Sequence, residues 1–338
     1  MFKKRNLMIA VCIVMCLGLL VVGCSTANKE PESSKEASWP EKPVEIIIPV
    51  PAGADIDSLT RIIGEELRKE FGQPFFVTNM PGGALTIGTE KVAKSAPDGY
   101  TLLATPLGGI TMQPQYRELP YKYTDLEPIS LLSIGADVLY TKAGKFKDLE
   151  DLVSYIKENP GKVKYGVAAV GALAHISTED LLVKIGGEGN PVGFEGDADC
   201  LMALLGGHID FAFIGGTAYE YVKSGDLTPL AVGTPERVSV LPDCPTFKEL
   251  GYDVSSDGWQ GFLAPKGIPE DIADKLNKAI NSIIERPEIT ERITGVGRHT
   301  KLMSREEFKQ FIEADFNKYN KIINESPAGE KIKKMMAK

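Results

Sequence analysis

The sequence predicts an α/β protein built from two successive sets of strands and helices. Short apolar runs alternate with stretches whose apolar residues recur at helical spacing, and this alternation is typical of parallel sheets covered by helices. The chain has 338 residues, enough for two domains at about 150 residues each. Its 43% hydrophobic and 25% charged residues exclude a disordered chain, a collagen and a polytopic membrane protein.

The N-terminal segment differs from everything after it. Three basic residues precede an apolar run over 7–22, which ends at Gly23 and Cys24. The run is shorter than the roughly 20 residues needed to cross a membrane, so we predict a secretory signal peptide. It resembles a bacterial lipoprotein signal, which implies removal of residues 1–23 and acylation of Cys24; an uncleaved N-terminal anchor is the alternative. Both place the protein outside a cytoplasmic membrane, at the cell surface or in the periplasm.

Removal of this leader makes the chain more acidic. The leader carries three positive charges and no negative ones, so the net charge changes from −8 to −11. Nucleic acid is therefore not expected as a partner. Residues 24–38 are polar and are expected to form a disordered tether before a fold that begins near Trp39. Beyond the leader, Cys200 and Cys244 lack metal-site spacing, and we expect either a bridge or two buried thiols.

The first set of elements begins with the apolar run 44–50, which is expected to be a strand buried on both faces. Residues 57–71 follow, with an amphipathic helical pattern. Further strands are predicted at 75–78, 101–104 and 129–133, and a helix at 148–159 that Asn159-Pro160-Gly161 ends.

A second set repeats the alternation, and helices complete the chain. Strands are predicted at 162–168, 191–194, 209–214 and 228–233, with helices between them at 174–185, 197–205 and 218–224. After the apolar stretch 259–265, helices are expected at 270–285, at 305–324 and from residue 330.

Glycine-rich turns follow two of the predicted strands. At such strand ends the free N–H groups of a helix N-terminus bind anions without a charged side chain. Gly53 lets the backbone approach a ligand closely, and Asp57 either caps the helix or contacts the ligand. The turn over 165–175 is a second candidate cradle, although an ordinary strand-to-helix turn is the alternative. Catalytic signatures such as GxSxG, HExxH and GK[S/T] are absent, and the chain has three His. We therefore expect no enzyme activity, no cofactor and no metal site.

An ordered set of short motifs resembles one known family across nearly all of residues 39–324. These motifs are APDGYTLL at 96–103, LPY at 119–121, PISLL at 128–132, LPDCPT at 241–246 and WQGFLAP at 259–265, together with His175. In order and spacing they are similar to the Bug-type substrate-binding proteins of tripartite tricarboxylate transporters.

The resemblance implies a periplasmic-binding-protein type II fold, with two α/β lobes joined by hinge crossings near Tyr140 and Asp257. Residues 39–139 and 258–338 would form a discontinuous first lobe, and residues 140–257 a second lobe. Ligands of the family are typically carboxylates, held by backbone amides and ordered water. The implied ligand-binding residues are Pro51, Ala52, Gly53, Ala54, Asp57, Val167, Ala169, Gly171, Ala172, His175, Phe194, Glu195 and Gly196.

Several of these positions depart from the family pattern. Ala54 stands where the first loop usually has Gly, and the turn over 167–172 lacks two Ser hydroxyls. Phe194-Glu195-Gly196 replaces a common Tyr-Lys-Gly, and Ile214 or Gly215 replaces an acidic residue. A more apolar pocket with an added carboxylate disfavours citrate-like polyanions. We therefore expect a monocarboxylate with an apolar or cationic part.

The function that follows is that of a lipid-anchored, monomeric receptor outside the cytoplasm. It would capture a small carboxylate between its lobes and deliver it to integral membrane permease subunits of the tripartite tricarboxylate type. Two alternatives remain: an enzyme outside the cytoplasm on the same two-lobed scaffold, and a ligand receptor for a sensor kinase.

Overall fold

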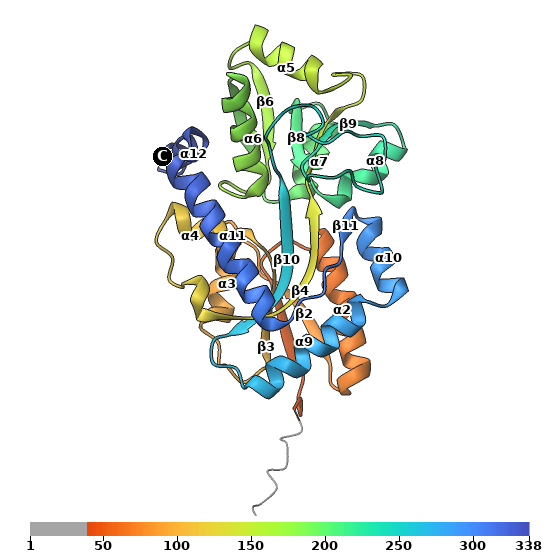
Figure 1. Cartoon of the computed structure of the whole chain (residues 1–338), viewed down its shortest axis with the longest axis vertical. Coiled ribbons are helices and arrows are strands. Elements are labelled where there is room, and N and C mark those ends of the chain that lie inside the picture. The colour runs from red at the N-terminus through yellow and green to blue at the C-terminus, as the bar shows by residue number, and fades with distance from the viewer. Residues whose placement is uncertain (1–38, 338) are drawn as a thin grey trace, which may run out of the picture. The chain divides into compact units, whose positions relative to one another are not determined.

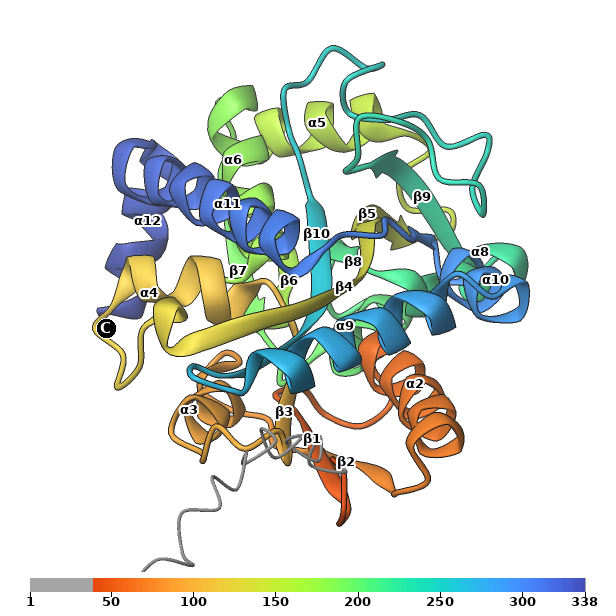
Figure 2. The same ribbon diagram turned by 60° about the horizontal axis from the view of Figure 1, so that its bottom comes forward.

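The structure, a computed structural model, describes residues 39–337. The predicted leader, Cys24 and the predicted tether lie outside the described residues. From Pro40 onward the chain contains two β-sheets with flanking helices, as Figure 1 and Figure 2 show.

The first sheet has six strands in the order β11–β4–β10–β3–β1–β2. β1 pairs with β2 and β3 in parallel, and Ile46, Ile47 and Ile48 are fully buried, as the apolar run predicts. β10 enters antiparallel between β3 and β4, so a late segment of the chain completes an early sheet. The strands are β1 (Val44–Ile48), β2 (Phe75–Asn79), β3 (Thr101–Pro106), β4 (Leu126–Ala136), β10 (Asp257–Pro265) and β11 (Arg298–His299).

The second sheet has five strands in the order β7–β6–β8–β5–β9. β6 is parallel to β7 and β8, whereas β5 is antiparallel to β8 and β9. The core on this sheet includes the stacked rings of Tyr165 and Phe211, 5.8 Å apart. The strands are β5 (Val138–Lys142), β6 (Val163–Val167), β7 (Gly189–Gly193), β8 (Phe211–Ile214) and β9 (Leu227–Val232).

Most helices pack against one sheet each. Helix α5, for example, lies within the helix predicted at 148–159 and buries Leu149, Leu152, Val153 and Ile156 on one face. Around the first sheet lie α2 (Asp55–Phe71), α3 (Thr86–Ala93), η1 (Gly108–Met112), α4 (Gln113–Tyr116), η2 (Tyr123–Asp125), α9 (Glu270–Ile284), α10 (Pro287–Gly295) and α11 (Arg305–Glu325). Around the second lie α5 (Leu149–Glu158), α6 (Leu173–Ile185), α7 (Asp197–Leu205), η3 (Gly216–Ala218) and α8 (Tyr219–Lys223).

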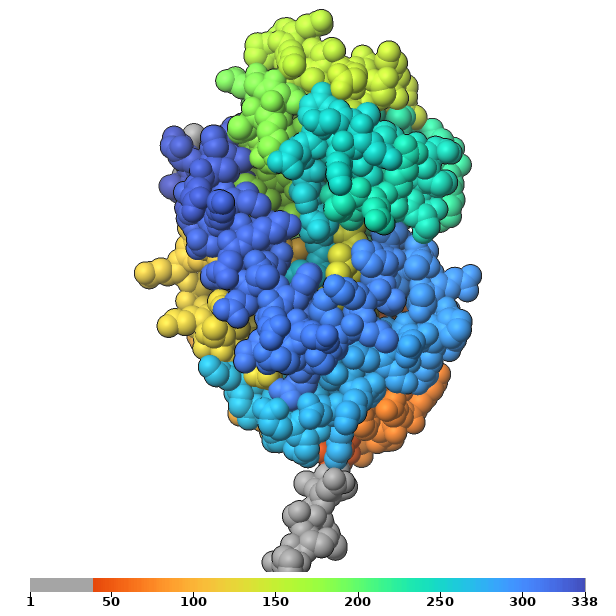
Figure 3. All heavy atoms as spheres, in the orientation of Figure 1, coloured from red at the N-terminus to blue at the C-terminus, as the bar shows by residue number. Residues whose placement is uncertain are grey.

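The chain passes between the sheets at two neighbouring points. Only Asp137 separates β4 from β5, and Tyr140 already lies within β5; the return follows Val232 and ends at Asp257. Asp137 N–H donates to the Ser256 carbonyl (2.9 Å), and the Ser256 hydroxyl donates to the Asp137 carboxylate (3.1 Å). The two crossings are therefore bonded to each other. Figure 3 shows a hollow in the surface where β4 (yellow) and β10 (teal) pass between the sheets.

The C-terminal helices connect the two sheets. Helices α9 and α11 pack on β4 of the first sheet. Helix α12 (Pro327–Met336) differs, because it packs on α6 beside the second sheet, as Figure 1 shows. The α11–α12 pair thus touches elements of both sheets.

Several elements differ from the sequence predictions. The first helix begins at Asp55 rather than at Asp57, so Asp57 occupies the third helical position. Helices α3, α4 and α10 were not predicted. Helix α3 follows two positive-φ residues, Ala84 and Leu85, and contains small and polar residues that give little helical periodicity.

Candidate functional site

Three helices begin at the turns that were predicted to bind ligand. Their N-cap residues are Ala54 for α2, Ala172 for α6 and Gly196 for α7, and none of them forms a side-chain cap. By contrast, Asp148 and Ser304 cap α5 and α11 through their side chains. No side chain therefore occupies the first N–H groups of α6 and α7, which remain available to an anion. In α2 the Ile56 N–H donates to Asp55 Oδ1 (2.7 Å), so this helix offers fewer free donors.

The loop before α2 is held by Asp57 from within. Both Asp57 oxygens are engaged: Oδ2 accepts the Gly53 N–H (3.1 Å), and Oδ1 accepts from Arg61 (3.1 Å) and Asn79 (3.0 Å). Although burial alone would raise the pKa of Asp57, these hydrogen bonds hold it below its usual value. Of the other predicted ligand residues here, Ala52 and Gly53 are exposed, and Pro51 and Ala54 are partly buried. Asp57 thus stabilises the loop in the manner of a cap.

The turn before α6 is covered by α4 from the first sheet. Gln113 donates to the Val170 carbonyl (3.1 Å), and a Cβ added to Gly171, whose φ is +76°, would lie 2.8 Å from the Tyr116 ring. Val167 is buried, while Ala169 and Ala172 are partly buried. This predicted cradle is therefore in contact with both sides of the molecule.

His175 fixes the same turn from inside α6. It is 1% exposed, and its Nδ1 accepts the Gly171 N–H at 3.1 Å. Burial, aided by the nearby charge of Lys331, lowers the pKa of His175 to about 4. The imidazole is therefore neutral at physiological pH and acts as a hydrogen-bond acceptor in the turn.

The third predicted segment, residues 194–196, contacts both the loop before α2 and the turn before α6. Phe194 is partly buried, and its N–H donates to the Val167 carbonyl (2.9 Å), which joins it to the second turn. A Cβ added to Gly196 would lie 3.5 Å from the Pro51 ring, so the first loop and the third segment are in contact. Glu195 is exposed.

A charged cluster that the sequence did not reveal lies between these turns. Arg298 from β11, 8% exposed, donates to the Ser133 hydroxyl and the Gly258 carbonyl (2.8 Å each) and pairs with Asp55 at 3.5 Å. The Arg298 side chain passes over Gly135, where an added Cβ would lie 2.7 Å from Arg298 Cγ. Asp55 also accepts from Gln260 (2.9 Å).

Two further carboxylates, Asp137 and Asp197, belong to this cluster. Both approach Gly215, because a Cβ there would lie 3.6 Å from Asp137 Oδ1 and 3.9 Å from Asp197 Oδ2. Burial raises the pKa of Asp197 to about 7, and repulsion from Asp137 and Asp55 adds to this. Burial raises the pKa of Asp137 to about 6, with Arg298 opposing the rise.

One signal in the sequence pointed towards this cluster. Asp197 directly follows Gly196 at a predicted helix start, two residues from the carboxylate that was named, Glu195. Nothing local distinguishes Arg298 or Asp137, because each reaches the cluster only through the crossings and the last strand of the first sheet.

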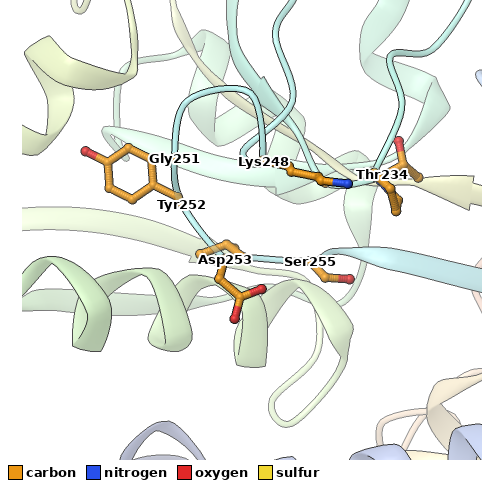
Figure 4. A pocket seen from close by; sticks show the side chains of 9 residues that line it. Thr234, Lys248, Gly251, Tyr252, Asp253 and Ser255 are labelled. Carbon is orange, nitrogen blue, oxygen red and sulfur yellow. The ribbon is translucent and has the colours of Figure 1, made fainter.

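A separate groove of about 460 Å³ lies beside the second sheet. Figure 4 shows Lys248 extending towards Thr234, with Tyr252 pointing away from both. None of the predicted ligand residues lines it. Its walls are Gly233, Thr234, Pro235, Lys248, Gly251, Tyr252, Asp253, Val254 and Ser255.

Residues 39–337 contain neither a metal-binding cluster nor a membrane-spanning helix. Within this range no group of three His, Cys, Asp or Glu side chains is arranged to hold a metal ion. No helix in the described part is long and apolar enough to cross a membrane. Cys200 and Cys244 are both buried and free, which settles the choice between a bridge and two thiols.

The fold and the site define the class of protein. Two mixed α/β sheets, linked by paired crossings with uncapped helix N-termini between them, form a periplasmic-binding-protein-like fold. Residues 59–327 match the family model described as the tripartite tricarboxylate transporter family receptor, TctC. The chain belongs to this family, whose members are transport receptors rather than enzymes.

Individual relatives agree with this assignment. The chain is 31% identical to protein BugT of Bordetella pertussis over 86% of its own length and 91% of the relative. The periplasmic binding protein BugD is 29% identical, with a TM-score of 0.79 over 86% of this chain and 99% of that one. Rpa4515 of R. palustris, solved with adipate, is 27% identical, with a TM-score of 0.81 over 85% of this chain and 97% of that one.

Proposed function

We propose that this receptor is tethered to the outer side of the cytoplasmic membrane through Cys24 and binds a small carboxylate between two lobes. The lobes are the predicted ones, residues 39–139 with 258–338 and residues 140–257. The receptor then delivers its ligand to integral membrane permease subunits. The observation that carries the proposal is the meeting of three uncapped helix N-termini beside the paired crossings. The adipate-bound relative supports a carboxylate as ligand.

The N-terminus of α6 is the best place for the ligand carboxylate. The first turn of α2 contains Asp55 and Asp57, and that of α7 contains Asp197 and Asp199, whereas the first turn of α6 contains no acidic residue. A ligand carboxylate meets least repulsion at α6, where its charge also interacts favourably with the helix dipole. This placement agrees with a monocarboxylate that has an apolar or cationic part.

Binding is expected to favour closure of the lobes. Pro51 approaches Gly196, and Gln113 bonds to Val170, so residues from both sides already meet around the turns. A ligand that touches both sides binds the closed state more tightly than the open one and shifts the population towards it.

The test combines binding with anchoring. Calorimetry on the full-length protein in detergent is expected to show saturable binding of at least one small carboxylate, recovered unchanged after long incubation. Absence of binding, or conversion of the ligand, contradicts the receptor proposal. Separately, Cys24→Ala is expected to release the protein from the membrane fraction when the leader is processed, and continued membrane association contradicts the lipid anchor. Loss of ligand uptake on deletion of the protein separates transport from signalling.

A further inference from the structure

Asp137 and Asp197, two carboxylates beside the crossings, receive only partial compensation from Arg298, which pairs with Asp55. Arg298 pairs with Asp55, and Lys318 lies 3.4 Å from Asp257. Among residues 39–337, neither Asp137 nor Asp197 has an ion-pair partner. Asp197 accepts a hydrogen bond from the Gly215 amide and Asp137 one from the Ser256 hydroxyl, and neither bond supplies a full positive charge. Two adjacent, partly buried anions are costly unless a cation joins them.

The neighbouring cations cannot shift to neutralise this pair. The Arg298 guanidinium is held by the Ser133 hydroxyl and the Gly258 carbonyl as well as by Asp55, and its stem is fixed against Gly135. Lys318 is on α11 and pairs with Asp257. Within residues 39–337 no cation pairs directly with Asp137 or Asp197, so without a ligand protonation has to relieve their repulsion.

Unsatisfied hydroxyl groups on the same side of the cleft provide independent support. Tyr219 is 2% exposed and its hydroxyl has no hydrogen-bond partner. This hydroxyl lies against Gly297, the residue before Arg298, and its strongest charged neighbour is Asp137. The buried Thr217 hydroxyl, also in the segment after β8, is without a partner as well. Because buried polar groups are normally satisfied, the unpartnered Tyr219 hydroxyl beside Asp137 supports a polar ligand at this site.

We propose that Asp137 and Asp197 bind a cationic nitrogen of the ligand, so that the ligand is an amino acid or another carboxylate bearing a protonated amine. This inference rests on the proposed receptor function. The carboxylate lies at the N-terminus of α6, and the ammonium group lies between Asp137 and Asp197. An organic cation fits better than a metal ion, because the described residues contain no three-ligand cluster.

Asp137 and Asp197 also couple ligand binding to closure of the lobes. Asp137 lies at the crossing that follows β4 of the first sheet, whereas Asp197 begins α7 beside the second sheet, and the two carboxylates repel each other. An ammonium group between the sides replaces this repulsion with attraction, so amine-bearing ligands favour closure. Dicarboxylates lack an ammonium group that could attract the two carboxylates, and they add a further negative charge.

The test uses matched pairs of probes on the full-length protein in detergent. Each standard L-amino acid is compared by thermal shift and calorimetry with its deaminated acid, such as leucine with 4-methylpentanoate, and adipate is included. We expect the best amino acid to bind at least about tenfold more tightly than its deaminated partner, since a desolvated charge pair is lost. Asp197→Asn is expected to remove this preference, and Asp137→Asn provides a second variant.

The control is Asp199→Asn, which removes the same charge from the same helix turn at an exposed position. It is expected to leave the preference intact. The inference is overturned if adipate or deaminated acids bind as tightly as every amino acid, or if Asp197→Asn leaves the preference unchanged; either result leaves the receptor function standing. Failure of all these carboxylates to bind contradicts the receptor function and this inference together.

Discussion

An ion pair with one fully buried partner joins α12 to α6. Lys331 Nζ lies 2.6 Å from Glu179 Oε2, and the Glu179 side chain is 0% exposed. The Tyr165 hydroxyl donates to the other Glu179 oxygen. Replacing Lys331 with Met keeps the apolar stem and removes the charge, which leaves Glu179 with one neutral donor. We expect this variant to be destabilised.

The magnitude follows from the exposure of the two partners. Removing one member of a fully buried pair costs about 3–5 kcal/mol. The Lys331 side chain is 39% exposed, so solvent already screens part of the attraction, and the expected loss is roughly 1–3 kcal/mol. Urea unfolding of the full-length protein in detergent measures it.

Helix α12 also offers a matched control. Lys334 pairs with Glu330 at 2.7 Å, but both side chains are more than two-thirds exposed. Lys334→Met is therefore expected to cost less than about 0.5 kcal/mol. Adding Glu179→Gln to Lys331→Met is expected to restore part of the loss, because no buried charge then remains. Equal effects of Lys331→Met and Lys334→Met would refute the assignment of a buried pair.

Three further predictions concern the turns, the cleft and the thiols. Gly171→Ala places a Cβ at positive φ and 2.8 Å from the Tyr116 ring. The free energy of unfolding is therefore expected to fall by about 1–2 kcal/mol in thermal unfolding, and calorimetry is expected to show weaker ligand binding. Unchanged stability and unchanged affinity would show that the turn is open. The folded-state pKa of Asp197, about 7, exceeds its usual 3.8, so the ligand-free native state holds an extra proton between these values and loses stability as pH rises through about 7. Asp197→Asn is expected to gain stability relative to the wild type as the pH rises from about 4 to about 7, and parallel pH profiles would contradict this. Burial raises the pKa of Cys200 and of Cys244 to about 12, so peptide mapping is expected to find both unlabelled by thiol reagents until the protein unfolds; rapid labelling of the native protein would contradict their burial.

Local patterns predicted most of the strands and long helices. The run at β1 and the apolar face of α5 are properties of neighbouring residues, so their secondary structure can be inferred from the sequence. Helix ends were less accurate: Asp57 resembled an N-cap, but α2 begins two residues earlier, with Ala54 as the uncapped N-cap residue. The packing of α12 on α6 could not be predicted, because its contacts, such as that between Lys331 and Glu179, join residues far apart in the sequence.

The candidate site was also only partly predictable from the sequence. The Gly53 and Gly171 turns were found because strand-to-helix turns have a recognisable composition, whereas the Gly196 turn was predicted from the family resemblance. The charged cluster was not found, because Arg298 reaches it from a strand more than 200 residues after Asp55 in the sequence. Glu195 was chosen as the added carboxylate of the pocket, yet it is exposed.

A crystal structure of the complex with the tightest-binding amino acid tests the central claim most directly. The account predicts the ligand between the two sheets, its carboxylate on the Leu173 and Ala174 amides and its nitrogen within hydrogen-bond distance of Asp197. A ligand in the groove near Lys248, or a ligand whose carboxylate faces Asp197, would contradict the account.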